Sequence, residues 1–240
     1  MSQNPPRPRW SFDEAVSRVP FLRALEAGDL KRLRPYATFR TIPRGQPVWS
    51  RDDELSHYVF LVAGHAKLCR ACETGRDVIL DVCAPGELLC ASAVANFSPA
   101  CCTCLAMDED VTVVLLPRRD VLRMIEQSAP AAGALLHETS GRDMRLGRRI
   151  VELSSGQVER RVAALLVRLA DQIGATDHAG HVQIPLRLSR QDLADLCGTT
   201  METTIRTMTK LAREDIVHTG TLGPIITNRI RLDLLAGGAG

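Results

Sequence analysis

Residues 188–217, LSRQDLADLCGTTMETTIRTMTKLAREDIV, constrain the fold of this chain more than any other segment. Ser189 and Asp192 have the spacing of a capping box, in which two side chains satisfy backbone amides at the start of a helix. A helix is therefore expected from about Arg190, with Gly198 providing a tight turn at its end. A second helix follows that turn, and two short helices joined in this way are typical of a helix-turn-helix.

The second helix of this segment is expected to have an inner and an outer face. Thr199 and Glu202 give a second capping signal, and the helix is expected to run to about Arg213. Such a helix packs on its own domain with one side and leaves the other side free for a partner. The inner stripe is expected to comprise Ile205, Met208 and Leu211, with Ala212, and the outer face Glu202, Arg206, Thr209, Lys210 and Arg213.

The polar outer face suits a helix that enters the major groove of DNA. Arg206 can donate two hydrogen bonds to the O6 and N7 atoms of guanine, and Glu202 can accept one from the N4 group of cytosine. Downstream, HTGTLGPIITNRIRLD is typical of a two-stranded wing. The alternative is a two-helix corner with a solvated charged face, in which Glu202 only caps its helix.

The N-terminal half of the chain has a different pattern. Residues 1–19 are expected to form a loose arm, and residues 20–34 a short helical pair. From residue 36 to residue 117, short extended runs alternate with glycine-containing turns, which predicts a small sandwich or barrel. The expected domains are the arm at 1–19, a β-roll sensor domain at 20–130, a long helix at 131–153 and a helix-turn-helix domain at 154–240.

The long helix between the two domains carries a short heptad pattern. Its positions Leu136, Thr139, Asp143, Leu146, Ile150 and Leu153 alternate by three and four residues, which is the spacing of a coiled coil. This spacing predicts a homodimer in which the helix meets its copy, with packing on its own domain as the alternative. The SSGQ stretch at 154–157 interrupts the pattern and marks the domain boundary.

Taken together, these features resemble the Crp/Fnr family of transcription regulators. The resemblance extends from about residue 20 to residue 237 and includes PGE at 85–87, ERRVAALLVRL, SRQDLADLCG, METTIR and the closing LLAG. It implies an α+β fold with an N-terminal cyclic-nucleotide-binding-type β-roll, a long dimerisation helix and a C-terminal winged helix-turn-helix. It also implies a homodimeric DNA-binding regulator rather than an enzyme, with RNA polymerase as a further candidate partner.

The same resemblance implies roles for individual residues. Glu202 and Arg206 match the pair with which the family reads a G·C base pair, which implies palindromic double-stranded DNA with TTGA-like half-sites. Met201 and Ile205 depart from the best-known members of the family, so the resemblance implies only a TGA-like core of the half-site. Arg190, Gln191, Thr200 and Thr203 match positions that contact phosphate, and Lys210 on the outer face completes the expected DNA contacts.

The β-roll lacks the side chains with which the cyclic-AMP-binding branch of the family holds its ligand. That branch uses a glutamate and an Arg-Ser pair, and the matching regions here read Cys90-Ala91 and Pro99-Ala100. No lysine, arginine or histidine occurs between Arg76 and Arg118. Because a buried cyclic phosphate needs a cation or many donors, we expect that the roll is not a cyclic-nucleotide receptor.

The eight cysteines suggest instead that the roll senses a redox or gas signal through sulfur. Four thiolates suit an iron–sulfur cluster or zinc, and the expected ligands are Cys83, Cys90, Cys101 and Cys104. Cys69, Cys72 and Cys102 remain candidate ligands, and His57 or His65 would serve a haem. The alternatives are a reversible thiol–disulfide switch, a small organic effector without a cofactor, and cysteines that only fill the core.

Composition limits the remaining classes of protein. No run of eighteen apolar residues is present and the first residues contain no apolar signal region, so we expect a cytoplasmic protein with no membrane partner. The net charge is only +2, so DNA binding must depend on local arrangement of basic residues. A thiol oxidoreductase or metal-handling protein is the alternative of another class. It is disfavoured because neither C-x-x-C pair opens a helix after a strand.

Overall fold

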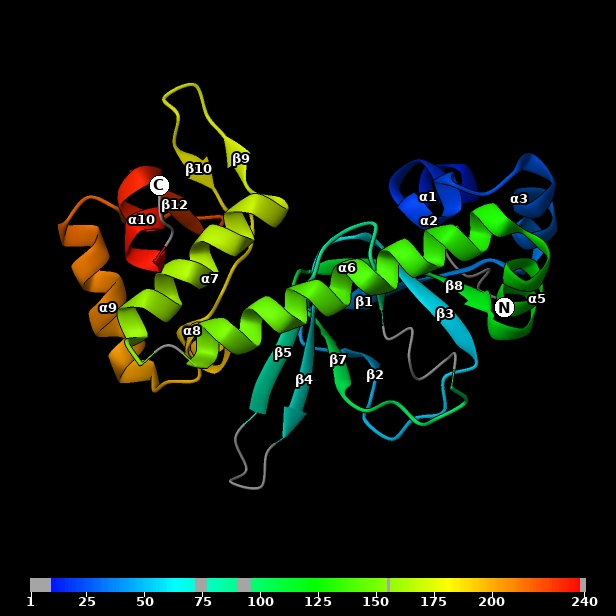
Figure 1. Ribbon diagram of the computed structural model, residues 1–240, viewed down its shortest axis with the longest axis horizontal. Helices are drawn as coiled ribbons and strands as arrows, with labels where there is room; N and C mark the ends of the chain where they lie inside the picture. The colour runs from blue at the N-terminus through cyan, green and yellow to red at the C-terminus, as the bar shows by residue number, and fades with distance from the viewer. Residues whose placement is uncertain (1–9, 72–76, 90–95, 155, 238–240) are drawn as a thin grey trace, which may run out of the picture. The chain divides into compact units, whose positions relative to one another are not determined.

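The computed structural model describes residues 10–71, 77–89, 96–154 and 156–237. The chain divides into two compact units, a roll unit of residues 1–68 and 83–142 and a C-terminal unit of residues 69–82 and 143–240. Both units combine helices and sheet, and the chain contains a roll, a long helix and a helix-turn-helix (Figure 1). This confirms the predicted fold class. No described helix is both long and apolar enough to cross a lipid bilayer.

The roll unit begins with short helices that cover part of its core. Helix α1 (Phe12–Arg18) starts at a capping box, in which the Ser11 side chain accepts from the amide of Glu14. The prediction of a loose arm over residues 1–19 is wrong for this helix, because Phe12 and Ala15 are buried in the core. Residues 1–9 of the arm lie outside the described residues. The predicted helical pair is present as α2 (Pro20–Arg23) and α3 (Ala27–Leu33), followed by the 3-10 turn η1 (Arg34–Tyr36).

Two four-stranded sheets form the roll. Their strand orders are β1-β8-β3-β6 and β2-β7-β4-β5. Strand β3 is central in the first sheet, and five of its seven residues are buried, as expected of a strand covered on both faces. The first sheet contains β1 (Thr38–Pro43), β3 (His57–Ala63), β6 (Leu88–Leu89) and β8 (Asp110–Pro117), and the second contains β2 (Pro47–Trp49), β4 (Ala66–Ala71), β5 (Asp77–Cys83) and β7 (Thr103–Ala106).

The glycine of the PGE motif allows the roll to close against the N-terminal helices. Gly86 has a φ of +98°, a conformation that strains residues with a side chain. A Cβ atom at this position would lie 2.9 Å from the carbonyl oxygen of Arg18. The core beneath these helices is closed by the rings of Phe21 and Phe60, which stack with centroids 5.1 Å apart.

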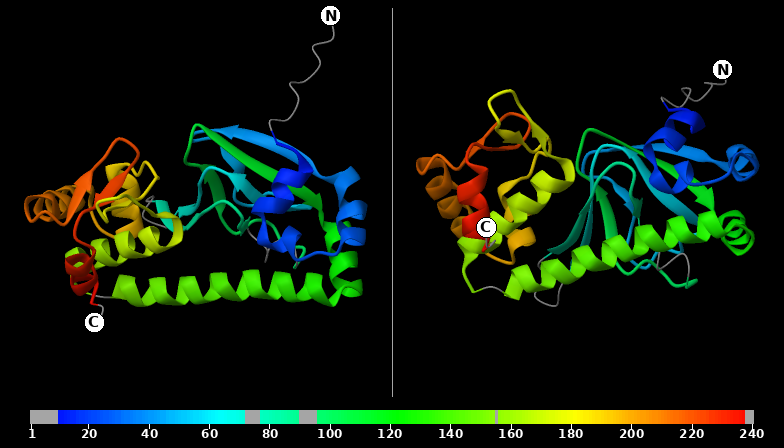
Figure 2. Two further views of the ribbon diagram at one scale, coloured as in Figure 1. Left: turned by 90° about the horizontal axis from the view of Figure 1, so that it is seen from above. Right: turned by 45° about the horizontal axis from the view of Figure 1, so that its top comes forward.

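Helix α5 (Arg118–Gln127) leads into α6 (Ala129–Ser154), which is one continuous helix that belongs to both units (Figures 1 and 2). Within the roll unit, α6 directs Glu138 and Arg142 to the backbone of Leu88: Glu138 accepts from its amide at 3.2 Å and Arg142 donates to its carbonyl at 2.9 Å. These contacts fix which side of α6 faces the roll.

The exposed row of α6 differs from the predicted seam. Leu136 and Ile150 are 67% and 68% exposed, and Asp143 between them is exposed as well. Thr139 and Leu146, which the heptad pattern also placed on the seam, are half-buried. The exposed row lies opposite the side that faces the roll and reads Leu136, Ser140, Asp143, Gly147 and Ile150.

The described part of the C-terminal unit combines helices α7 to α10 with a small sheet. Helix α7 (Val158–Ile173) begins after the predicted break at 154–157 and buries Leu165, Leu166 and Leu169. A four-stranded sheet of order β11-β12-β10-β9 includes the predicted wing, in which β11 and β12 pair antiparallel. The strands are β9 (Ala175–Thr176), β10 (Val182–Gln183), β11 (Val217–Thr219) and β12 (Pro224–Ile226), and the helices after α7 are α8 (Arg190–Cys197), α9 (Met201–Arg213) and α10 (Arg229–Ala236).

Candidate nucleic-acid interface

The first helix of the motif begins and ends where the sequence predicts. Ser189 Oγ accepts from the amide of Asp192 at 2.9 Å, and Asp192 accepts from the amide of Ser189 at 2.9 Å, which completes the capping box. Gly198 ends α8 with a left-handed φ of +57°. Leu193 and Leu196 are buried, as predicted. Local sequence therefore determines both ends of α8.

The second helix starts one residue later than the predicted capping signal. Thr200 is the residue that caps α9, because its Oγ1 accepts from the amide of Thr203 at 3.2 Å. The prediction that Thr199 and Glu202 form the cap is wrong, and Glu202 instead lies exposed in the first turn. A carboxylate in this turn is favourable because it faces the positive end of the helix dipole.

The inner face of α9 is shifted from the predicted one at a single position. Met208 and Leu211 are buried, as predicted, and Thr204 is also buried, with its hydroxyl donating to the carbonyl of Thr200. Ile205 is 40% exposed, so the prediction that it belongs to the inner stripe is wrong. One turn of 3.6 residues before Met208 falls nearest Thr204, whereas Ile205 lies on the outer face.

The outer face of α9 presents a set of polar side chains to solvent. Glu202 and Arg206 are exposed on successive turns, four residues apart, and so lie on the same side of the helix. The Arg206 guanidinium lies near the helix N-terminus, with Nη2 3.4 Å from Thr203 Oγ1. The exposed members of this face are Met201, Glu202, Ile205, Arg206, Thr209 and Arg213. Views from two directions show α9 at the edge of the C-terminal unit (Figures 1 and 2).

The other predicted DNA contacts differ in their exposure and in their hydrogen bonds. Arg190 and Gln191 are exposed in the first turn of α8, and Gln191 donates to Asp195 at 2.6 Å. Lys210 is half-buried and donates to Glu159 of α7 at 2.8 Å. The hydrogen bond to Glu159 and that carboxylate's charge raise the pKa of Lys210. Lys210 thus ties α9 to α7 within the C-terminal unit.

Two arginines outside the motif support the end of α8. Arg149 of α6 donates from Nη2 to the Leu196 carbonyl at 3.2 Å, and Arg161 of α7 donates from Nε to the Cys197 carbonyl at 2.9 Å. The last carbonyls of a helix have no partner within the helix, so these side chains satisfy them. The sequence gives no local signal for either contact, because Arg149 and Arg161 lie 47 and 36 positions away from their partners.

Cys197 is part of the core of the C-terminal unit, as its sequence position predicts. Its side chain is 1% exposed, and burial raises the pKa of its thiol to about 12. The nearby Arg149 and Arg161 lower the pKa but do not offset the burial. This thiol is therefore neutral at ordinary pH and packs as a small apolar group.

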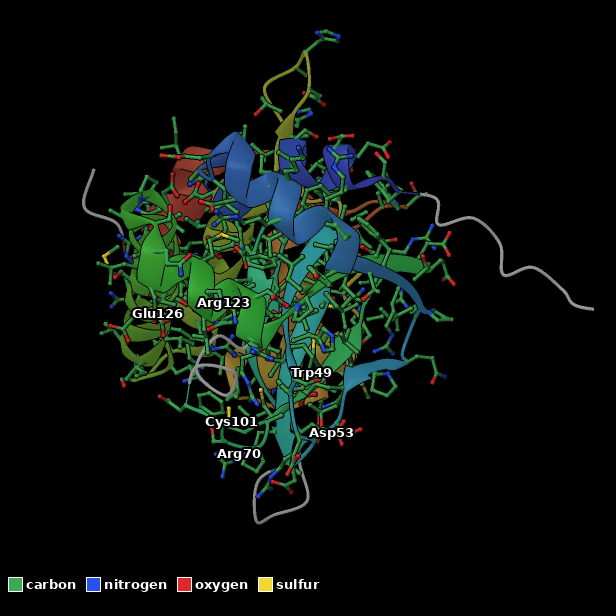
Figure 3. The ribbon with its side chains drawn as sticks, turned by 90° about the vertical axis from the view of Figure 1, so that its right-hand side faces the viewer. Trp49, Asp53, Arg70, Cys101, Arg123 and Glu126 are labelled. Carbon is green, nitrogen blue, oxygen red and sulfur yellow. The ribbon has the colours of Figure 1, made fainter. Side chains whose placement is uncertain are left out.

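The predicted metal ligands do not gather in the part of the chain that the structure describes. Cys83 and Cys104 are fully buried, whereas Cys101 is exposed on the outside of the roll (Figure 3). Cys102 is buried, and its carbonyl accepts from the Trp49 indole at 2.9 Å. Cys90 lies outside the described residues. Among those residues, no three His, Cys, Asp or Glu side chains are grouped as metal ligands. The described members of the predicted set are thus not grouped as ligands of one site, and a four-thiolate site that includes Cys90 stays a prediction.

A cation does reach the roll from a distant part of the sequence. Arg142 of α6 places Nη2 3.5 Å from the sulfur of Cys83, in addition to its bond with the Leu88 carbonyl. The sequence contains no cation between Arg76 and Arg118, but Arg142 lies 59 positions after Cys83 and supplies one. The inference that this part of the roll lacks positive side chains is therefore wrong.

The comparisons with known proteins match a different family model to each half of the chain. A family model for a Crp-like helix-turn-helix domain matches residues 160–235, and one for a cyclic nucleotide-binding domain matches residues 39–128. The transcriptional activatory protein AadR of Rhodopseudomonas palustris is 30% identical over 189 residues, which cover 77% of this chain and 76% of that protein.

The chain belongs to the Crp/Fnr family of transcription regulators. The nitrogen fixation regulation protein FixK of Bradyrhizobium diazoefficiens is 28% identical to this Crp/Fnr protein over 221 residues, 90% of each chain. The structure of FixK2 from Bradyrhizobium japonicum has the same fold, with a TM-score of 0.73 and 22% identity over 85% of this chain and 99% of that one. This Crp/Fnr protein is accordingly a DNA-binding transcription regulator, and α8 and α9 form its helix-turn-helix.

Proposed function

We propose that this Crp/Fnr regulator binds palindromic DNA as a homodimer, with α9 of each copy in the major groove of a TTGA-like half-site. The observation that supports this most is the exposed pair of Glu202 and Arg206 on one side of α9. Arg206 would donate two hydrogen bonds to guanine, and Glu202 would accept one from the cytosine amino group. A base pair read by both residues accounts for a carboxylate and a guanidinium four positions apart on an otherwise accessible helix.

The phosphate contacts would flank this reading face. Arg190 and Gln191 lie exposed at the start of α8, and Thr200 lies exposed at the start of α9, so side chains at two helix N-termini are accessible. Helix N-termini favour anions because of their unpaired amides and their dipoles. These contacts would position α9 and contribute affinity that does not depend on the base sequence.

The DNA proposal is tested by measuring affinity for two matched duplexes. One carries TTGA and TCAA half-sites with centres about 10 base pairs apart, which is the spacing that a two-fold dimer requires. The other has the same composition with both half-sites scrambled. At physiological salt we expect the palindrome to bind at least about 1000-fold more tightly in fluorescence anisotropy titrations. Equal affinities for the two duplexes would contradict the proposal.

The exposed row of α6 is the proposed dimer contact. Leu136 and Ile150 are large apolar side chains at equivalent heptad positions, and both are exposed in the single chain. An Ile150→Glu variant is expected to sediment as a monomer at micromolar concentration, whereas His137→Glu, on another side of α6, should remain dimeric. A dimeric Ile150→Glu variant in analytical ultracentrifugation would place the dimer contact elsewhere.

For the signal, we propose that the roll senses redox state or a gas through its thiols. The contact of buried Cys83 with Arg142, whose Nη2 lies 3.5 Å from the sulfur, supports this because it links a thiol of the roll to helix α6. The iron–sulfur cluster, zinc and haem stay predictions, as do the cytoplasmic location and contact with RNA polymerase. Protein purified without oxygen tests the cofactors: a visible absorption band with iron and acid-labile sulfide would support a cluster. A colourless, metal-free protein that is insensitive to oxidants would contradict the thiol proposal as a whole.

A further inference from the structure

An open groove runs between α6 and α7 inside the C-terminal unit. Its volume is about 510 Å³, which is in the range of small-molecule sites. Four arginines lie on its walls, Arg145 and Arg148 from α6 and Arg160 and Arg168 from α7. Apolar side chains, among them Ala164 and Val167, form the rest of the lining. The groove therefore combines an apolar surface with several guanidinium groups.

The carboxylates of the groove do not balance its arginines. Asp171 is bound by Arg229, which lies outside the groove, at 2.8 Å, and Glu152 lies 3.5 Å from Nε of Arg168. Arg160 donates from Nε to the backbone carbonyl of Ala236 at 3.3 Å, which is a neutral acceptor. Arg148 is exposed and makes no hydrogen bond or ion pair with any described residue. The groove thus has an excess of positive charge.

A further arginine, next to Arg148 in the sequence of α6, is buried and has one donor without a hydrogen bond. Arg149 is 6% exposed, and its Nη1 is buried without a hydrogen-bond partner among the described residues. The Nε atom of Arg168 is also buried and makes no hydrogen bond. Burial lowers the pKa of Arg149, and the like charge of Arg168 lowers it further. A buried donor without a hydrogen bond beside like charges is costly, and an anion bound in the groove would offset the repulsion between those charges.

We propose that this groove binds a small organic oxyanion, with its carboxylate or phosphate group against the arginines and a compact apolar part on Ala164 and Val167. Guanidinium groups match the geometry of carboxylates and phosphates and bind both with two parallel hydrogen bonds. Arg145, Arg148 and Glu152 lie on a different side of α6 from the exposed row of Leu136, Asp143 and Ile150. A dimer formed through that row leaves the guanidinium wall open.

Ligand binding here would act on the helix-turn-helix through Arg149. This residue donates to the Ile79 carbonyl of β5 and to the Leu196 carbonyl at the end of α8. An anion that draws the neighbouring arginines toward the groove would change how Arg149 holds α8. This effect on DNA rests on the proposed function, whereas binding of the anion does not.

The test is calorimetric titration of the full-length protein, without DNA, with phenyl phosphate and with benzoate. Saturable binding of either probe is expected, and phenol, which lacks the oxyanion, should produce none. Saturation by only one of the two would identify the oxyanion as phosphate or as carboxylate. The double variant Arg148→Gln, Arg160→Gln should weaken binding at least about 10-fold, since it removes two charged donors from the groove. Both side chains are exposed, so the variant is expected to fold.

The matched control is Arg23→Gln, which removes an exposed arginine of the roll unit and should bind both probes like the wild type. The proposal is overturned if neither probe shows saturable binding. It is also overturned if the wild type and the double variant bind the probes with equal affinity. Either result leaves the DNA proposal intact, because these titrations contain no DNA.

Discussion

Helix α9 and strand β7 each carry a candidate functional group, but they present it differently. α9 exposes Glu202 and Arg206, whose polar side chains do not pack in the core of the C-terminal unit. β7 and the turn before it bury Cys102 and Cys104, whose positions are explained by packing inside the roll. Polar groups held outward imply an external partner, whereas buried thiols imply only a core until chemistry is measured. The exposed face of α9 is therefore available to a partner such as DNA, whereas a sensing role for the thiols must be tested with chemical probes.

Thiol alkylation is expected to show the largest contrast between exposed and buried sites. A pKa of about 12 leaves Cys197 about one part in 10,000 thiolate at pH 8, compared with about a quarter for an ordinary cysteine. Burial protects it further, because labelling needs local opening. Native protein treated with iodoacetamide and analysed by mass spectrometry should label Cys101 at least about 1000-fold faster than Cys197. In urea the two rates should converge. Comparable native rates would show that the motif core opens readily.

Substitutions on the two faces of α9 should differ in their effect on the free energy of unfolding. Leu211 is fully buried, so Leu211→Ala is expected to lower the free energy of unfolding by about 2–5 kcal/mol. Ile205→Ala, on the outer face, should change it by less than about 0.5 kcal/mol. Urea denaturation followed by circular dichroism measures both. A cost for Ile205→Ala similar to that for Leu211→Ala would restore Ile205 to the core and move the reading face.

The parts of the fold that follow from neighbouring residues were predictable. Ser189 with Asp192 and the turn at Gly198 determine α8, and both are visible in a ten-residue window. The cap of α9 was misplaced by one residue because Thr199 and Thr200 are equally good capping residues. Helix α1 was missed because seven residues give too few turns to establish a period.

The parts of the site that depend on contacts distant in sequence were not predictable. Arg142 reaches Cys83, and Arg149 reaches the Leu196 carbonyl, across 59 and 47 positions. A long basic side chain on an amphipathic helix has the same local pattern whether it is solvated or buried. Tertiary packing alone decides which of these arginines becomes part of a site.

Loss of a capping box should lower stability moderately in either unit, but it should lower DNA affinity only in the C-terminal unit. Ser189→Ala removes the side chain that caps α8, and Ser11→Ala removes the equivalent one of α1. Each is expected to cost about 1 kcal/mol of stability. Only Ser189→Ala should also weaken binding to the palindromic duplex, because α8 positions α9. Equal DNA affinities for the two variants would separate α8 from DNA recognition.

The smallest effect is expected at Lys210. Its ion pair with Glu159 lies at the surface, so Lys210→Met should leave the denaturation midpoint nearly unchanged. If Lys210 contacts phosphate, the slope of log affinity against log salt concentration should fall by about 1 for each half-site. Glu159→Gln serves as the control, since it breaks the same pair without removing a cation. An unchanged slope in Lys210→Met would assign this residue to structure alone.

The central claim is that Arg206 reads one G·C base pair in each half-site. The direct measurement compares the affinities of wild type and Arg206→Ala for the palindrome and for a duplex in which that pair is replaced by A·T in both half-sites. The wild type should lose about 1–3 kcal/mol for each replaced pair, whereas Arg206→Ala should lose most of this discrimination and keep only the part that Glu202 contributes. An Arg206→Ala protein that still prefers the original duplex as strongly as the wild type would contradict the account.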